Sequence, residues 1–300
     1  MTALLHIHLE PAVRLARRRG MKPSLLRSRE AFFREHDPIG RTPESLTDLA
    51  WLIPELHAEL SQQDTSYAEV RFSPRRFSAD DHVLRHVLEA ASHAALPLSH
   101  PMMRLILLVN RNSPRSFIDA CRREIAAGLP PAFIGLDLAG DELRFPDITR
   151  FQQLFGEARA AYLGITVHAG EFGPEKNIWR AIDELGAQRV GHAVTAGGRR
   201  ALTTRLAVDE IVVEAAIGSN VALHAVPTLA DHPLPWLMDQ RVRVCLNTDV
   251  PLQVGTDLRS EWELADKLVG SDQETTSTLL ETAELGAFNL GGSEHGARAI

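Results

Sequence analysis

Short apolar segments with β-strand character alternate with helical segments along this 300-residue chain. Eight strand segments occur, and helical sequence follows each of them. Such an alternation indicates parallel strands joined by crossover helices, and eight units are typical of a closed (β/α)8 TIM barrel, an α/β fold. The expected strands are residues 3–10, 67–74, 105–109, 132–138, 165–167, 189–193, 211–215 and 242–249, and the expected helices include 45–60, 81–94, 116–127, 151–162, 177–185 and 234–239.

Length and composition fit one such barrel. The architecture needs about 250 residues plus insertions, and no Gly/Ser-rich linker or shift in composition divides the chain, so we expect a single domain over residues 1–300. Hydrophobic residues make up 44% and charged residues 24% of the sequence, which is ordinary for a globular protein.

Several classes of protein are disfavoured by the same numbers. No apolar run approaches the roughly 18 residues of a membrane span, and residues 1–10 lack a basic start before an apolar stretch, so neither a membrane segment nor a secretory signal is expected. A net charge of -7 argues against nucleic-acid binding. Cys121 and Cys245 are far apart in the sequence, which favours neither a disulfide framework nor a cysteine-bound metal. We expect a cytoplasmic protein.

The segment from Gly164 to Glu171 has the features of a catalytic strand end. A β-branched run stops at His168, Ala169 and Gly170 permit a sharp turn, and Glu171 follows. A histidine at this place can bind a metal and a carboxyl group just beyond it can carry a proton. A buried histidine closed by an ordinary turn is the alternative, so other parts of the chain must supply further ligands.

The first expected strand carries His6 and His8. Side chains alternate along a strand, so these two imidazoles lie on one face and form half of a metal site. A chance pair of histidines near a chain terminus is the alternative.

Polar residues end several of the expected strands. Active sites of such barrels lie at the carboxyl ends of the strands, and His6, His8, His168, His192 and Asp249 all fall there. Three neutral imidazoles and a carboxylate suit zinc with an open position for water. A water bound to zinc ionises near neutral pH, Asp249 and His192 can orient or deprotonate it, and Glu171 can protonate the group under attack.

These residues lie in motifs that resemble, in their order and over nearly the whole chain, the adenosine deaminase family of zinc-dependent amidohydrolase barrels. The motifs are HIHLE at 6–10, EVRFSP at 69–74, GLDLAGDE at 135–142, HAGE at 168–171, RVGHA at 189–193, SN at 219–220 and NTD at 247–249. The resemblance implies one Zn²⁺ per chain held by His6, His8, His168 and Asp249. It also implies that Glu171 protonates a purine ring, that His192 orients the attacking water, that the backbone of Gly140 lies against the purine and that Glu10 lies near the sugar.

The sequence departs from the family pattern at three places. Val250 follows Asp249 where adenosine-deaminating members usually have a second aspartate that contacts the purine, Pro11 and Ala12 follow Glu10 where a glycine and a small residue are usual, and residues 216–217 are Ala-Ile where Cys-Pro is usual. All metal ligands remain, so the departures concern the substrate-binding residues, Val250 above all. Neutral drift around an unchanged adenosine site is the alternative explanation.

The sequence therefore predicts a hydrolytic deaminase of adenosine or a related 6-aminopurine nucleoside that releases ammonia. A deaminase of another amino-substituted heterocycle, or of a specialised purine nucleoside in a biosynthetic pathway, is a second candidate. A non-catalytic nucleoside-binding barrel is a third, which the retained Glu171 and His192 disfavour. The sequence does not set the oligomeric state.

Other conspicuous residues have no predicted catalytic role. The basic run at residues 14–19 is expected to be the solvated face of a first helix that Gly20 ends. His82, His86, His93, His224 and His232 are expected to be surface or structural residues.

Overall fold

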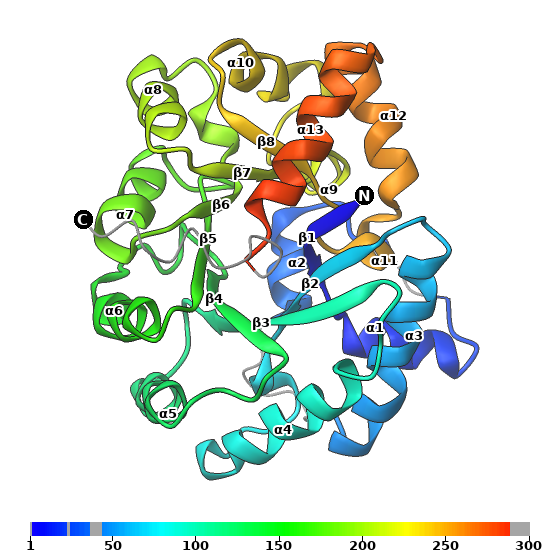
Figure 1. Ribbon diagram of the computed structural model, residues 1–300, viewed down its shortest axis with the longest axis vertical. Coiled ribbons are helices and arrows are strands. Elements are labelled where there is room, and N and C mark those ends of the chain that lie inside the picture. Colours follow the sequence, from blue (N-terminus) through cyan, green and yellow to red (C-terminus); the bar gives the residue numbers. More distant parts are fainter. Residues whose placement is uncertain (1, 23–24, 37–43, 289–300) are drawn as a thin grey trace.

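The computed structural model describes residues 2–22, 25–36 and 44–288. Their eight strands are all parallel and form one sheet in the order of the sequence, as Figure 1 shows. The strands are β1 (Ala3–His8), β2 (Tyr67–Phe72), β3 (Met102–Asn110), β4 (Phe133–Ala139), β5 (Gly164–Ala169), β6 (Arg189–His192), β7 (Val212–Ala215) and β8 (Arg243–Leu246). The predicted (β/α)8 TIM barrel is confirmed.

Strand β8 returns to β1 and closes the sheet. Ile7 and Asp249 form a parallel bridge, the His8 N–H donates to the Asp249 carbonyl at 2.8 Å, and the Asp249 N–H donates to the His6 carbonyl at 3.1 Å. Below this bridge the side-chain oxygen of Asn247 accepts the N–H groups of Leu5 and His6 at 2.9 and 2.8 Å. The closure thus fixes His6, His8 and Asp249 relative to one another.

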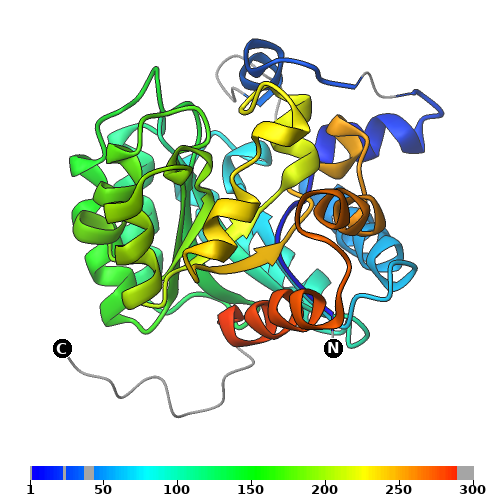
Figure 2. The same cartoon turned by 90° about the horizontal axis from the view of Figure 1, so that it is seen from above.

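Helices surround the barrel (Figures 1 and 2). Their apolar faces pack on the outward faces of the strands in one large core, in which side chains such as Leu52, Leu88 and Phe155 have no exposed surface. The outer helices are α1 (Pro11–Arg18), α3 (Leu49–Ser61), α4 (Leu84–Ala95), α5 (Arg115–Ala126), α6 (Gln152–Ala160), α7 (Lys176–Leu185), α8 (Arg200–Val208), α10 (Leu234–Asp239), α12 (Leu258–Val269) and α13 (Gln273–Gly286). The described residues also form α2 (Arg29–His36), α9 (Ile217–Ala222) and α11 (Pro251–Val254).

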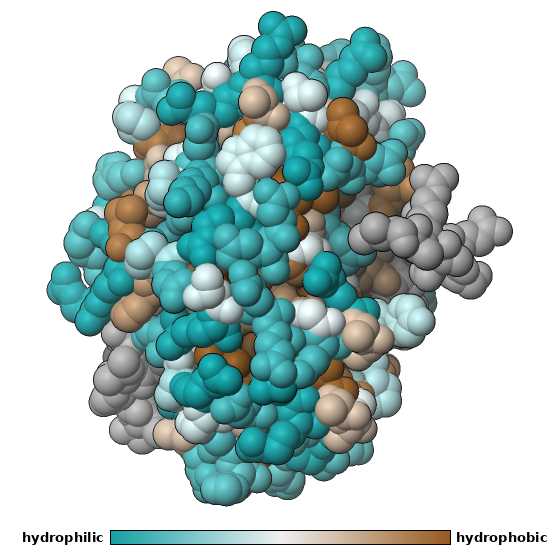
Figure 3. Space-filling model, turned by 90° about the vertical axis from the view of Figure 1, so that its left-hand side faces the viewer, coloured by the Kyte–Doolittle hydropathy of each residue, from teal (hydrophilic) through white to brown (hydrophobic). Residues whose placement is uncertain are grey.

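A helix that spans a bilayer must be both long and predominantly apolar. No helix in the described residues meets both conditions. The face shown in Figure 3 is mainly hydrophilic, with apolar residues scattered singly over it, as on an ordinary protein surface.

The inside of the barrel is filled by buried charged side chains. Arg71 pairs with Asp137 and Glu214, and Arg189 pairs with Glu214 and Glu69. All five are at most 1% exposed. Charges this deep are stable only when each is paired, so the network rigidly fixes the strands that carry it. At the amino end of the strands α13 packs on β8 and β1, and the ring of Phe288 closes the barrel 3.6 Å from the Arg189 guanidinium.

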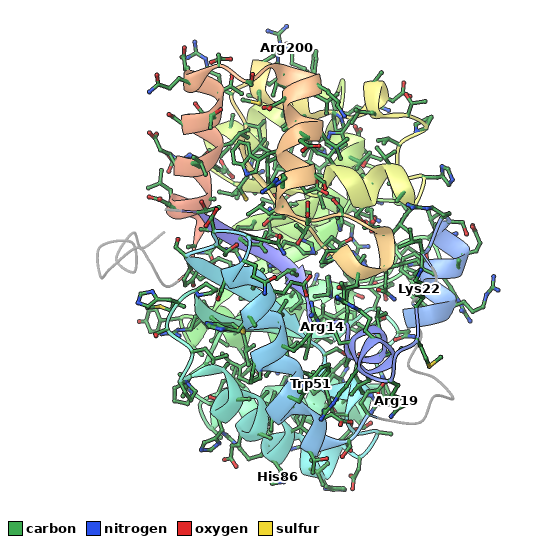
Figure 4. The ribbon with its side chains drawn as sticks, turned by 90° about the vertical axis from the view of Figure 1, so that its right-hand side faces the viewer. Arg14, Arg19, Lys22, Trp51, His86 and Arg200 are labelled. Carbon is green, nitrogen blue, oxygen red and sulfur yellow. The ribbon has the colours of Figure 1, made fainter. Side chains whose placement is uncertain are left out.

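The expected solvent exposure of residues 14–19 is wrong for Arg14. Its side chain is fully buried between α1 and α3, where it donates to the Leu9 carbonyl at 2.8 Å and pairs with Glu55 and Glu59 (Figure 4). Two acidic residues on the facing helix make this burial possible. Arg17, Arg18 and Arg19 are exposed as expected.

Candidate functional site

A cavity of about 540 Å³ lies at the carboxyl ends of the strands. This volume suits a small-molecule ligand of nucleoside size. The cavity wall includes the predicted site residues His8, Glu10, Gly140, His168, Glu171, His192 and Asp249. His6 lies beneath them with no exposed surface.

Four predicted metal ligands converge at the floor of this cavity. The His8 Nε2 atom lies 3.3 Å from Nε2 of His6 and 3.3 Å from Nε2 of His168. Oδ1 of Asp249 lies 3.3 Å from the His8 Nε2 and 3.5 Å from the His6 Nε2. Ligands that each lie about 2.0–2.1 Å from a tetrahedral zinc are about 3.3 Å apart. The donor set and its spacing therefore fit a zinc ion.

His192 is also close to this cluster. Donor atoms of His6, His168, His192 and Asp249 all lie within 4.8 Å of one another. Distance alone therefore leaves both His8 and His192 as candidates for the third imidazole ligand.

Buried partners orient the ligands from behind. Nδ1 of His6 lies 3.0 Å from Oε2 of Glu214, and Nδ1 of His168 lies 3.0 Å from Oδ2 of Asp137. Each carboxylate favours a hydrogen on Nδ1, which leaves the Nε2 lone pair directed at the cluster. Ser219 donates its hydroxyl to Oδ2 of Asp249 at 2.6 Å, so Oδ1 faces the same point.

The sequence-based site did not include these supporting residues. Asp137 and Glu214 each lie in a strand whose other residues are mostly apolar. The only sign of their role in the sequence was a single acidic residue within such a strand. Despite burial, the Arg71 and Arg189 guanidinium groups hold the pKa of Glu214 well below its usual range. The His168 imidazole and Arg71 likewise hold the pKa of Asp137 low. Both acids are therefore carboxylates that can accept from an imidazole.

The turn that carries Glu171 is built around another carboxylate, Glu142. The Glu142 oxygens accept the backbone N–H groups of residues 170, 171, 172 and 173 at 2.8 to 3.1 Å, and the side-chain amide of Asn177 at 3.0 Å. Gly170 has φ +70° here, and a Cβ atom on it would lie 2.5 Å from the Ile178 side chain. The glycine and Glu142 together set where Glu171 points.

The surroundings of Glu171 favour its protonated form. Glu171 is only 7% exposed. Burial and the nearby Asp249 carboxylate raise the pKa of the Glu171 side chain well above the usual value. Its Oε2 atom lies 3.8 Å from Nε2 of His192. An acid whose pKa is raised in this way holds its proton to higher pH than usual, and beside a metal-type cluster it can donate that proton to a ligand.

Comparison with known proteins assigns the chain to a family. The family model described as adenosine deaminase matches residues 15–290. The chain belongs to the adenosine deaminase family. An adenosine deaminase from Edwardsiella ictaluri is 38% identical over 224 residues, which cover 72% of this chain and 66% of that relative. The predicted family is confirmed.

Solved structures share the fold of this family member. An adenine deaminase from Arthrobacter aurescens superposes with a TM-score of 0.80 at 22% identity and covers 96% of this chain and 93% of its own. An amidohydrolase from Burkholderia ambifaria with bound Zn gives 0.79 at 22% identity, with 96% and 85% covered. The chain matches 61 to 66% of the length of its curated adenosine deaminase relatives.

The three predicted substrate contacts of this adenosine deaminase family member lie in different surroundings. Glu10 is on the cavity wall, accepts the N–H groups of Leu252 and Gln253 at 3.3 and 3.1 Å, and has its pKa raised to about 8 by burial. Gly140 is also on the wall, with φ +113° and no room for a Cβ atom, which would lie 2.5 Å from the Asn110 amide.

Val250 is set apart from the cavity wall. It has no exposed surface and packs with Leu223 and Val254 in a small apolar cluster, against which Phe32 and Phe172 also pack. It borders the site through Asp249, its neighbour in sequence.

Proposed function

We propose that the chain is a zinc-dependent hydrolytic deaminase of adenosine or a related 6-aminopurine. The observation that carries the proposal is the set of imidazole and carboxylate donors at 3.3 to 3.5 Å spacing beside the buried Glu171, whose pKa is raised by burial. The cavity volume suits one nucleoside-sized molecule, and curated relatives that match the chain at 38 to 40% identity are adenosine deaminases. The reaction replaces the ring amino group by oxygen and releases ammonia.

Each residue has a place in this reaction. His6, His8, His168 and Asp249 would hold one zinc ion per chain, which when bound lowers the pKa of a water molecule and makes it a nucleophile at neutral pH. His192 and Asp249 orient this water against the amino-bearing carbon. Glu171 gives its proton to the adjacent ring nitrogen as the water oxygen bonds to the carbon. Of the two water protons, Asp249 takes one and passes it to the amino group, which leaves as ammonia, and the other returns to Glu171. Glu10 and the Gly140 backbone position the substrate.

Val250 favours a second candidate within the same chemistry. In family members that deaminate adenosine, an aspartate usually follows the metal-binding aspartate and contacts the purine. Here an apolar cluster occupies that place. A site that lacks this polar partner no longer favours adenosine over related compounds. The substrate of this second candidate is therefore a different 6-aminopurine compound or another amino-substituted heterocycle. A barrel that only binds a nucleoside would not need Glu171 as a proton donor, so we do not favour that role.

The composition supports proposals about the domain organisation, the kind of substrate and the cellular compartment. We propose one barrel domain over residues 1–300 that acts on a free small molecule, since the net charge of -7 opposes binding of nucleic acid. Cys121 and Cys245 are both buried and unpaired, as in proteins of the reducing cytoplasm.

Metal analysis of the purified protein tests the proposal. We expect about one zinc per chain, and we expect His8→Ala to lose both the metal and turnover, because it removes one of four ligands. Circular dichroism of the variant controls for folding. A protein that binds no divalent metal and is not activated by added zinc contradicts the proposal.

A further inference from the structure

A line of buried side chains leads from a backbone amide to His192. The N–H of Leu234, at the start of α10, donates to Nδ1 of His232 at 3.2 Å. Nε2 of His232 lies 3.3 Å from Oδ1 of Asn220, and Nδ2 of Asn220 lies 2.9 Å from Nδ1 of His192. His232, Asn220 and His192 are all at most 3% exposed, so water does not compete for these bonds.

The direction of every bond in this line is set at its first member. A backbone N–H group can only donate, so Nδ1 of His232 is an acceptor. Burial lowers the pKa of His232 to about 4 and keeps the ring neutral, so its one hydrogen is on Nε2. That hydrogen needs an acceptor, which makes the facing atom of Asn220 its oxygen. The amide nitrogen of Asn220 then faces His192.

An amide nitrogen is a donor, so Nδ1 of His192 is an acceptor and carries no hydrogen. The one hydrogen of the neutral imidazole is therefore on Nε2, the atom that faces Glu171 and the metal-type cluster. The His192 backbone has φ +67°, uncommon for a residue other than glycine, so the main chain also holds the ring in a defined direction.

We propose that Asn220 and His232 are positioning residues that fix His192 as the Nε2–H tautomer. His192 then presents a hydrogen-bond donor to the cavity. A nitrogen that carries a hydrogen has no lone pair for a metal, so the third imidazole ligand is His8. The same nitrogen cannot take a proton from water, which leaves Asp249 as the proton acceptor. This last consequence rests on the proposed function, whereas the tautomer does not.

Nitrogen NMR of the imidazole groups in the zinc-loaded protein measures the tautomer directly, without substrate. We expect His192 to show a protonated Nε2 and an unprotonated Nδ1. Asn220→Asp replaces the amide donor by an acceptor, so the hydrogen of His192 should move to Nδ1. His232→Gln is the matched control, because its side-chain amide can still donate to Asn220 and should leave the Nε2–H tautomer in place.

Kinetics and metal content give two further readouts. Asn220→Asp should lower kcat on the order of 10²- to 10³-fold, as for loss of one preorganised donor, with KM little changed. His192→Ala should keep about one zinc per chain, in contrast to His8→Ala. Hydrogen on Nδ1 of His192 in the wild type, or loss of zinc in His192→Ala, overturns the inference. If the tautomer is as expected but no purine is deaminated, the proposed function fails and this assignment stands.

Discussion

Val250 is the residue at which this chain departs most clearly from its family, and the side chains that pack around it are apolar as well. Leu223, Val254 and the rings of Phe32 and Phe172 give it apolar surroundings. A carboxylate in this place would lose its hydration and lie mainly against apolar side chains. The valine is therefore part of a buried apolar cluster next to Asp249 and not of the cavity wall.

This setting predicts that adenosine is a poor substrate relative to the native one. Val250→Asp should raise kcat/KM for adenosine and lower it for the native substrate, while the buried carboxylate lowers the free energy of unfolding by roughly 2–5 kcal/mol. Val250→Ala is the control, because it adds space but no polar group. A wild-type kcat/KM for adenosine of about 10⁶ M⁻¹s⁻¹ lies within the range of efficient enzymes. Such a value would contradict the prediction and show that Val250 is a neutral substitution in an adenosine site.

At the scale of elements, the turn after β5 depends on one side chain from the turn after β4. The Glu142 carboxylate accepts five N–H groups, four of them from the backbone of residues 170–173. The strand ends alone would leave these N–H groups buried without acceptors. Glu142 therefore connects the position of Glu171 to that of the neighbouring strand.

We expect Glu142→Gln to destabilise the protein and to slow it. One of its two terminal atoms becomes a donor that faces N–H groups, so two or three of the five bonds are lost, at about 1–3 kcal/mol for each buried group left unsatisfied. Urea unfolding measures the loss, and kcat should fall because Glu171 is displaced. Unchanged stability and kcat would show that the turn holds its shape without this carboxylate.

Helix α9 is held by a second buried acid, Glu261 of α12. Its oxygens accept the N–H of Gly218, each at 3.1 Å, and the hydroxyl of Thr256 at 2.9 Å. The helix carries Ser219 and Asn220, which contact Asp249 and His192. Burial raises the pKa of Glu261 to about 7.

The raised pKa predicts a pH dependence of stability. The folded state binds the proton more tightly than the unfolded state, so the contribution of Glu261 is lost as pH rises from its ordinary pKa of 4.5 to about 7 and is constant above that. Between pH 5 and 8 the loss is on the order of 3 kcal/mol. Glu261→Gln should remove this loss in urea unfolding. Parallel stability curves for the two proteins contradict the assignment.

The order of elements was predictable because the alternation of strand and helix is a local pattern. The expected strand at 105–109 lies inside β3, and the expected helix at 45–60 corresponds to α3 with a short turn before it. The buried Arg14 was not predictable, because its partners Glu55 and Glu59 lie on another helix. Partners so distant in sequence leave no periodic signal.

The site was predictable to the same extent. Strand ends and motifs indicated His6, His8, His168, His192 and Asp249, and the structure brings all five together. Glu142, Asp137 and Glu214 were missed as supporting residues, because a carboxylate shows its role only through the groups that it faces. Their roles therefore need three-dimensional contacts.

On the scale of the whole molecule, the two ends of the barrel differ in structure: one is closed and the other holds the cavity. The amino end is closed by Phe288 and α13, and the middle is filled by paired charges that hold the strands. The carboxyl end is left open as the cavity with the metal-type cluster on its floor. Buried polar groups face a ligand-sized space there, so we place the chemistry at that end.

Ammonia release by the zinc-loaded protein tests this account most directly. The substrates are adenine, adenosine, their phosphorylated forms and amino-pterins, and Glu171→Gln is the matched control, because it keeps the shape and the zinc but lacks the acidic proton. We predict that the wild type releases one ammonia per molecule of at least one 6-aminopurine, and that Glu171→Gln is slower by about 10²- to 10⁴-fold. Release of no ammonia from any 6-aminopurine by zinc-loaded wild type, or a wild-type rate in Glu171→Gln, would contradict the account.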